Sequence, residues 1–368
     1  MRKFYQSISV LMCAVALVGC ASSYKSPVDL SKAKVDPVKV AEARQMAKTM
    51  EHYLHRAEAV ALSNESKCER KGPRMPFYLM SSPPWLESEM RDAFAVAAQW
   101  REQPRLIALR PVAQPFQGKF VTHLGSDKVL PDHHYITMIR AIRLAKEGKP
   151  VVLGFSDGTT ASFEYLEGCL GLTLAEPMPD MEPLNSGLGL ESLPLTFVAW
   201  AQSDDEELFL MGRSLYFTSG EGGHKLRVGA AVGRFVRGMT DIVSGGLIKH
   251  AYNAQEKAPG LVRARYLNES DAFGLEAAVR AGADPRAILA FVERLSQPAL
   301  KDKLPSDLVF TSARVAALRK VAAPFLSSPS GSEPSARADA PEHAVSSSLG
   351  SGGASPVVLS VASGHDRK

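Results

Sequence analysis

The N-terminal 20 residues determine the compartment in which the rest of this chain folds. Arg2 and Lys3 form a positive start, and an apolar stretch follows from Ile8 to Val18. The stretch is shorter than the roughly 20 apolar residues of a membrane-spanning helix, and its place at the start of the chain is typical of a secretory signal. We therefore expect the segment to be removed and the mature protein to work outside the cytoplasm.

The signal closes with Leu17-Val18-Gly19-Cys20-Ala21. This motif resembles the lipobox of bacterial lipoproteins, which implies a signal peptide over residues 1–19 and diacylation of the Cys20 thiol, with palmitate among the added chains. Ala21 stands where an inner-membrane retention signal carries aspartate, so the resemblance implies the periplasmic face of the outer membrane. The alternative is an ordinary secretory signal with a cysteine there by chance.

Two of the four cysteines are accounted for by this processing. Cys13 leaves with the signal and Cys20 is the lipid site, so Cys68 and Cys169 remain. In an oxidising compartment, two remaining cysteines predict one disulfide. The alternative is a pair of buried free thiols, whereas a two-cysteine zinc site lacks histidines at a supporting spacing.

Length and composition leave room for folded domains but give no sign of a nucleic-acid partner. About 350 residues remain after processing, enough for two modest domains and a tail. The apolar fraction of 45% supports a buried core, and the net charge of +4 falls when Arg2 and Lys3 are removed. No stripe of basic residues interleaved with aromatics is present, so we expect no nucleic acid to bind.

Residues 20–36 are small, polar and contain proline, as expected of a tether from a lipid anchor. Asp36-Pro37 then predicts a helix start, and it opens an N-terminal helical region over residues 37–103. His52 and His55 are spaced to bind a metal, but their charged neighbours favour a solvated surface. The apolar residues at helical spacing are Val40, Ala43, Ala47, Met50 and Leu54.

Residues 104–168 alternate between strand and helix patterns. We expect a strand from Phe116 to Leu124, a helix from His133 to Glu147, and a hairpin whose strands flank Ser156-Asp157-Gly158. The order is similar to the second half of a PDZ domain, although no candidate for the carboxylate-binding glycine loop is present. The alternative is a plain α+β connector.

The remaining patterns are mostly helical. A strand is expected over residues 195–200, and Asp284-Pro285 predicts a helix start with Ile288, Phe291 and Leu295 facing inward. Residues 327–368 are rich in serine, proline and glycine and should form a disordered tail. Further helices are expected over 204–217, 226–252 and 267–281.

The densest motif is the segment from Glu269 to Leu295, ESDAFGLEAAVRAGADPRAILAFVERL. Three shorter segments accompany it: residues 158–169, SDDEEL at 203–208 and TSARVAAL at 311–318. Together they resemble the zinc metallopeptidase family of HtpX and the CAAX prenyl proteases (family M forty-eight), in particular its periplasmic lipoprotein branch. The matching positions of the long segment are Asp271, Gly274, Leu275, Ala281, Gly282, Asp284, Pro285 and Ala287.

The metal-binding residues of that family are missing here. Its zinc helix needs H-E-x-x-H, because residues four apart share a helical face on which two imidazoles bind Zn²⁺ beside a general base. The resemblance places Arg213, Ser214 and Phe217 at these positions and Leu267 at the third ligand. Arginine repels a cation, phenylalanine has no lone pair, and Ser214 has no neighbouring base that would make it a nucleophile.

Asp271 is retained where the family has a residue that supports its ligands, although a carboxylate near a helix start can also serve the helix alone. The histidine expected after Thr311 is Ser312. Other residues that could rebuild a zinc site are Glu221 with His224, His250, and the pair His133-His134.

We therefore expect an α+β fold: a mainly helical, gluzincin-like metallopeptidase domain over residues 169–326 with a small PDZ-like α+β domain before it. The expected function is a non-catalytic, membrane-anchored lipoprotein without metal or cofactor that binds polypeptide or serves envelope quality control. Its partners would be the membrane, through the anchor, and periplasmic or outer-membrane proteins. One alternative is an active zinc metalloendopeptidase with atypical ligands, and another is a structural lipoprotein whose tail and PDZ-like part recruit partners.

Overall fold

The computed structural model describes most of the chain between residues 35 and 327. Helices and strands both contribute to it, which confirms the α+β class. Among the helices so described, none is both long and apolar enough to cross a membrane. The signal segment, Cys20, most of the tether, the predicted helix over 226–252 and the tail beyond residue 327 lie outside the described residues. The residues that the structure describes are 35–83, 86–97, 103–130, 134–170, 172–177, 184–185, 190–219 and 260–327.

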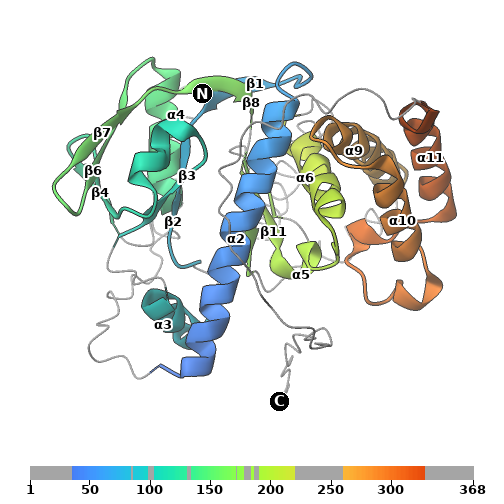
Figure 1. Cartoon of the computed structure of the whole chain (residues 1–368), viewed down its shortest axis with the longest axis horizontal. Coiled ribbons are helices and arrows are strands. Elements are labelled where there is room, and N and C mark those ends of the chain that lie inside the picture. The colour runs from blue at the N-terminus through green and yellow to red at the C-terminus, as the bar shows by residue number, and fades with distance from the viewer. Residues whose placement is uncertain are drawn as a thin grey trace, which may run out of the picture. The chain divides into compact units, whose positions relative to one another are not determined.

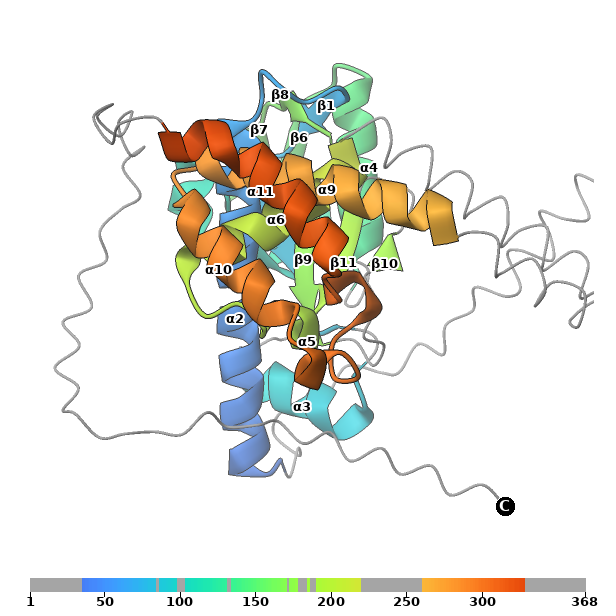
Figure 2. The same ribbon diagram turned by 90° about the vertical axis from the view of Figure 1, so that its right-hand side faces the viewer.

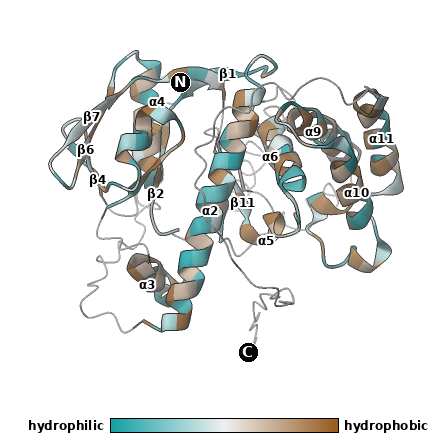
Figure 3. Ribbon diagram, in the orientation of Figure 1, coloured by the Kyte–Doolittle hydropathy of each residue, from teal (hydrophilic) through white to brown (hydrophobic). Residues whose placement is uncertain are grey.

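Helix α2 (Pro37–Ser63) begins where the sequence predicts. The carboxylate of Asp36 accepts a hydrogen bond from the Val38 backbone nitrogen at 2.9 Å, and Pro37 occupies the first helical position. Polar and apolar residues alternate along its length (Figure 3). Of the predicted apolar face, Ala43, Ala47, Met50 and Leu54 are buried.

Apolar side chains of α2 enter two separate hydrophobic clusters. The N-terminal half of the helix packs into the sheet-side cluster, which also contains Phe77, Ile107 and Leu153. The C-terminal half packs into the helix-side cluster, which also contains Phe209 and Phe291. Figure 1 shows α2 passing between these two groups of elements. Its contributions are Ala43, Ala47, Met50 and Leu54 to the first cluster, and Tyr53, Ala57, Val60 and Ala61 to the second.

The sheet-side cluster is built on antiparallel strands. Helix α3 (Ser88–Ala97) packs against α2, and α4 (His134–Lys146) packs near β2 and β6. The strands β5-β4-β6-β7 form one sheet in that order, and β2 pairs with β3 in another. Their bounds are β2 (Phe77–Met80), β3 (Arg105–Ala108), β4 (Val121–Leu124), β5 (Asp127–Lys128), β6 (Val151–Phe155) and β7 (Thr160–Phe163).

Two of the three predictions for this part hold. The β6–β7 hairpin turns at Gly158, whose φ of 82° is a conformation that glycine adopts without strain. Helix α4 matches the predicted helix within one residue at each end. The strand expected from Phe116 to Leu124 is wrong in its first half, because residues Pro111–Phe116 form the 3-10 helix η1 and Gly118 turns the chain with a φ of 79°.

Four helices form most of the helix-side cluster: α6 (Asp204–Ser219), α9 (Gly260–Arg280), α10 (Pro285–Leu295) and α11 (Ser312–Ser327). In Figure 2, α9, α10 and α11 face the viewer and α6 lies behind them. A short 3-10 helix, η3 (Ser306–Leu308), precedes α11. Strands β9 (Leu172–Glu176) and β11 (Leu190–Pro194) pair in parallel beside α6, and β10 (Leu184–Asn185) pairs with β11. Strand β1 (Lys71–Arg74) pairs with β8 (Leu166–Cys169), and η2 (Pro298–Leu300) follows α10.

The predicted helices 204–217 and 285–295 are confirmed by α6 and α10. Asp284 caps α10 by accepting a hydrogen bond from the Arg286 backbone nitrogen at 2.9 Å. The helix expected from Leu267 begins seven residues earlier, at Gly260. The strand expected over 195–200 is wrong: Leu195–Val198 form the helical turn α5, and the strand precedes it. The apolar run was too short for its period to distinguish strand from helix.

Candidate functional site

Helices α6 and α9 approach each other closely at two glycines. A Cβ atom built on Gly212 would lie 2.6 Å from the carbonyl oxygen of Gly274, and one on Gly274 would lie 2.5 Å from the Arg213 Cγ. Real side chains do not tolerate such distances, so both positions require glycine. This contact brings Arg213 of α6 next to Asp271 of α9.

Asp271 lies between two arginines at the centre of the site. The Arg213 Nε is 2.9 Å from Asp271 Oδ1. From α11, the Arg314 Nε donates to Oδ2 at 2.8 Å and its Nη2 donates to Oδ1 at 2.9 Å. All three side chains are buried, with 2%, 3% and 7% of Asp271, Arg213 and Arg314 exposed. We call Arg213, Asp271 and Arg314 the Arg–Asp–Arg cluster.

Main-chain carbonyls and an aromatic ring complete the surroundings of the two guanidinium groups. Arg213 Nη2 donates to the Asp307 carbonyl oxygen at 3.0 Å, and Arg314 Nη1 donates to that of Val309 at 2.7 Å. Both guanidinium groups lie near the ring of Phe310, at 5.6 and 4.1 Å from its centroid. Burial lowers the pKa of Arg314, and the Asp271 carboxylate acts against that shift. The cluster therefore joins α6, α9 and α11 by ion pairs, and hydrogen bonds to main-chain carbonyls tie it to the segment that precedes α11.

Of the positions assigned by the resemblance, the structure brings Arg213 and Asp271 into direct contact. Ser214 Oγ lies 2.6 Å from Thr173 Oγ1 of β9, and Phe217 lines a small pocket together with Arg213. Leu267 lies one helical turn before Asp271 on α9 and is partly buried. These side chains do not fit a zinc ion, because a guanidinium, a phenyl ring and an aliphatic group have no lone pair to donate to it.

The remaining histidine candidates do not come together in the described part of the chain. His52 of α2 is exposed and its Nε2 lies 2.8 Å from Glu207 Oε2, at the start of α6. His134 is buried against the hydroxyl of Ser81. His133, Glu221, His224 and His250 lie outside the described residues. Within them, no group of three or more histidine, cysteine, aspartate or glutamate side chains is placed to hold a metal ion.

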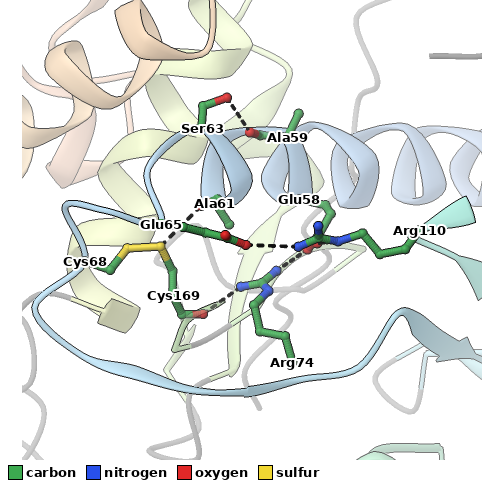
Figure 4. A network of polar contacts seen from close by, with 9 residues as sticks. All are labelled: Glu58, Ala59, Ala61, Ser63, Glu65, Cys68, Arg74, Arg110 and Cys169. Carbon is green, nitrogen blue, oxygen red and sulfur yellow. Dashed lines mark hydrogen bonds and ion pairs between the residues drawn. A yellow bond between two sulfur atoms is a disulfide. The ribbon is translucent and has the colours of Figure 1, made fainter. Parts of the chain in front are cut away.

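The predicted disulfide is confirmed. Cys68 and Cys169 are bonded, with their Cα atoms 5.3 Å apart and a sequence separation of 101 residues. The bond joins the chain that leaves α2 to the end of β8 (Figure 4). Both half-cystines are buried in the helix-side cluster.

A second network of buried charges lies next to the disulfide (Figure 4). Glu58 of α2, 2% exposed, contacts Arg74 of β1 and accepts a hydrogen bond from Arg110 Nε at 2.6 Å. Arg74 also donates from Nη1 to the carbonyl oxygen of Cys169 at 2.8 Å. Two guanidinium groups thus satisfy one buried carboxylate, and we assign this network to holding β1 and β8 on α2.

Sequence reasoning missed Arg314 and the ionic contact between Arg213 and Asp271. The signal available was one aspartate and two arginines within helices whose other inward positions are apolar, because buried charges are almost always paired. Comparison with the profiles of known protein families gives no match, and comparison with curated protein sequences gives none either. The resemblance to metallopeptidases therefore depends on the four sequence segments alone.

Proposed function

We propose that this protein is a lipid-anchored envelope protein with a metallopeptidase-like helical domain that binds polypeptide without cleaving it. The observation that carries the proposal is the Arg–Asp–Arg cluster. Where the resemblance places a zinc ligand, a guanidinium is buried against Asp271. The positive charge at this place is therefore part of the protein itself.

The cluster argues against hydrolysis for a chemical reason. A peptidase of the zinc type needs lone-pair ligands for the metal and a base for the attacking water. Arg213 and Phe217 supply neither, and the hydroxyl of Ser214 is 2.6 Å from that of Thr173, with no carboxylate or imidazole in that contact. What such an arrangement can still do is hold a polypeptide in an extended form beside the neighbouring strands.

The activity is tested on the full chain purified in detergent micelles. We expect no stoichiometric zinc by elemental analysis, no cleavage of fluorescein-labelled casein, and an increase of casein fluorescence anisotropy on titration with the protein. Stoichiometric zinc together with casein cleavage would contradict the proposal and establish the alternative, a zinc metalloendopeptidase with atypical ligands. Absence of casein binding would also contradict it.

The metallopeptidase-like fold is tested by rebuilding the lost site. The variant Arg213→His, Ser214→Glu, Phe217→His, Leu267→Glu carries the ligand set of the family, and we expect it to bind one zinc ion per chain. A control with the same changes except Phe217→His lacks one ligand and should bind zinc far more weakly. Equal zinc binding by the two variants, or none by either in folded protein, would contradict the proposed likeness of α6 and α9 to the zinc-binding helices.

The anchor is a separate part of the proposal. Acylation of Cys20 would hold the protein at the periplasmic face of the outer membrane, where its partners would be other envelope proteins. The variant Cys20→Ser should lose incorporation of labelled palmitate and move from the membrane fraction to the soluble periplasmic fraction. Retention of the label in Cys20→Ser would contradict it.

A further inference from the structure

One sheet of the sheet-side cluster ends in a strand whose outer edge is open. Strand β7 is the last in the order β5-β4-β6-β7, and within the described residues it pairs with β6 alone. Its four residues alternate between exposed and buried. Ala161 and Phe163 enter the sheet-side cluster, so Thr160 and Ser162 lie on the opposite face, in solvent. An uncovered edge of this kind can pair with a further strand.

The backbone hydrogen bonds show which residues of β7 face the open edge. The Phe155 nitrogen donates to the Thr159 carbonyl oxygen at 2.9 Å, immediately before β7. Hydrogen-bonded pairs alternate with non-hydrogen-bonded pairs along an antiparallel ladder, so the next residue, Thr160, and then Ser162 do not bond to β6. Val152, which lies opposite Ser162, accordingly accepts at its carbonyl oxygen from the residue after β4, at 2.8 Å. Thr160 and Ser162 therefore each direct one backbone N–H and one C=O to the open edge.

Apolar and acidic side chains follow directly after β7. Tyr165 and Leu166 are each 42% exposed, which is unusual for large apolar residues in the described part of the chain. Glu164 and Glu167 flank them and are exposed as well, and neither carboxylate forms an ion pair with another described residue. A strand paired with β7 reaches these side chains by extending a few residues further, at about 3.3 Å per residue.

These features select the chain that can add to the edge. The open backbone groups require an extended chain, the exposed apolar side chains favour apolar residues, and the two carboxylates favour lysine or arginine. A second copy of this protein fits less well, because it would bring its own Glu164 and Glu167 to the same edge. Like charges that face each other across a sheet are destabilising.

We propose that the open edge of β7 binds an extended polypeptide segment in which apolar residues alternate with lysine or arginine. The inference rests on the proposed function, and it names the strand that binds and the class of polypeptide that is bound. Main-chain hydrogen bonds to Thr160 and Ser162 supply affinity for any extended chain, whereas Glu164 and Glu167 select basic residues.

The selectivity is tested on the full chain in detergent micelles by fluorescence anisotropy. Two fluorescein-labelled peptides are compared, one alternating valine with lysine and one alternating valine with glutamate. We expect the wild type to bind the lysine peptide about tenfold more tightly, and the double variant Glu164→Lys, Glu167→Lys to reverse this preference. The matched control, Glu42→Lys with Glu87→Lys, changes the net charge equally at exposed positions on α2 and just before α3, and it should keep the preference of the wild type.

A second pair of variants tests the main-chain contact. Ser162→Pro removes an N–H from the open edge, where proline is tolerated because that N–H is not part of the ladder. Ser162→Ala keeps the N–H and is the control. We expect Ser162→Pro to weaken lysine-peptide binding about fivefold, the loss of one hydrogen bond, and Ser162→Ala to bind as the wild type does. If Ser162→Pro fails to fold, the charge reversal still tests the proposal, since it leaves the backbone unchanged.

Three outcomes would overturn the inference. The first is equal affinity of the wild type for the two peptides, and the second is equal affinity of folded Ser162→Pro and Ser162→Ala for the lysine peptide. The third is a wild-type dimer that Ser162→Pro converts to a monomer in sedimentation, which would assign the edge to a second copy. If the wild type still binds casein in these cases, the proposed function stands without the inference; if it binds neither casein nor either peptide, both fail.

Discussion

Replacing Asp271 by asparagine removes the carboxylate that contacts both guanidinium groups of the Arg–Asp–Arg cluster. Asp271 accepts two hydrogen bonds from Arg314, at 2.8 and 2.9 Å, and lies 2.9 Å from the Arg213 Nε. An asparagine of the same size has one acceptor oxygen left, and its amide nitrogen would face a guanidinium donor. The substitution therefore leaves two buried positive charges without the carboxylate that contacts both of them, and it changes almost nothing in volume.

The magnitude follows from burial. Removing one partner of a buried ion pair typically costs 3–5 kcal/mol, because the remaining charge has lost both its water and its counterion. We expect Asp271→Asn to lower the free energy of unfolding by about 3–5 kcal/mol, which is a large fraction of the total stability of an ordinary domain. Its effect should be far from additive with Arg314→Met, since both remove the same contact.

The assay is urea unfolding followed by circular dichroism, with linear extrapolation to water. The control is Glu293→Gln, which removes the same charge from an ion pair with Arg319 whose side chains are 47% and 59% exposed. Exposed ion pairs contribute about 0–1 kcal/mol to stability, so the free energy of unfolding of Glu293→Gln should be close to that of the wild type. If Asp271→Asn and Glu293→Gln lower the free energy of unfolding by equal amounts, the cluster does not hold the three helices together and the reasoning is refuted.

Three further predictions concern other contacts. Gly212→Ala should cost about 1–3 kcal/mol or more in urea unfolding, because its Cβ would press on the Gly274 carbonyl and separate α6 from α9; an unchanged midpoint would contradict this. Replacing Cys68 and Cys169 together by alanine should cost up to about 4–5 kcal/mol in the chain-entropy treatment of a loop of this length, and dithiothreitol should destabilise the wild type but not the double variant. A hydrogen bond from the Tyr216 hydroxyl, with Arg265 beside it, lowers the pKa of Glu269. The stabilisation of the fold by the ionised Glu269 carboxylate is therefore present above the ordinary pKa of glutamate and is lost as the pH falls through the lowered value. Glu269→Gln should therefore be less stable than the wild type at neutral pH and approach it as the pH falls through the lowered pKa, as judged by urea midpoints; a difference independent of pH would refute this.

Local signals in the sequence predicted the local features of the fold. Asp36-Pro37 and Asp284-Pro285 predicted the starts of α2 and α10, since capping and proline geometry involve only neighbouring residues. Gly158 likewise predicted the hairpin turn. The disulfide was predicted by counting the cysteines that remain after the expected processing, on the expectation of an oxidising compartment.

Features that depend on distant contacts were not predictable in this way. The helical turn at Leu195–Val198 is set by packing of Phe197 into the helix-side cluster, whereas its short apolar run also fits a strand. The contact of Arg314 with Asp271 joins residues 43 positions apart, so only the fold brings them together. For the candidate site, the sequence named two of the three members of the cluster but not their pairing.

The position of α2 in both hydrophobic clusters has a consequence for how the protein melts. Each cluster takes part of its apolar packing from the same continuous helix, so neither can lose that helix and keep its own interior intact. Heating should therefore produce a single calorimetric peak spanning both halves. A protease that cuts within α2 would leave two fragments, each with an exposed apolar surface and a tendency to aggregate.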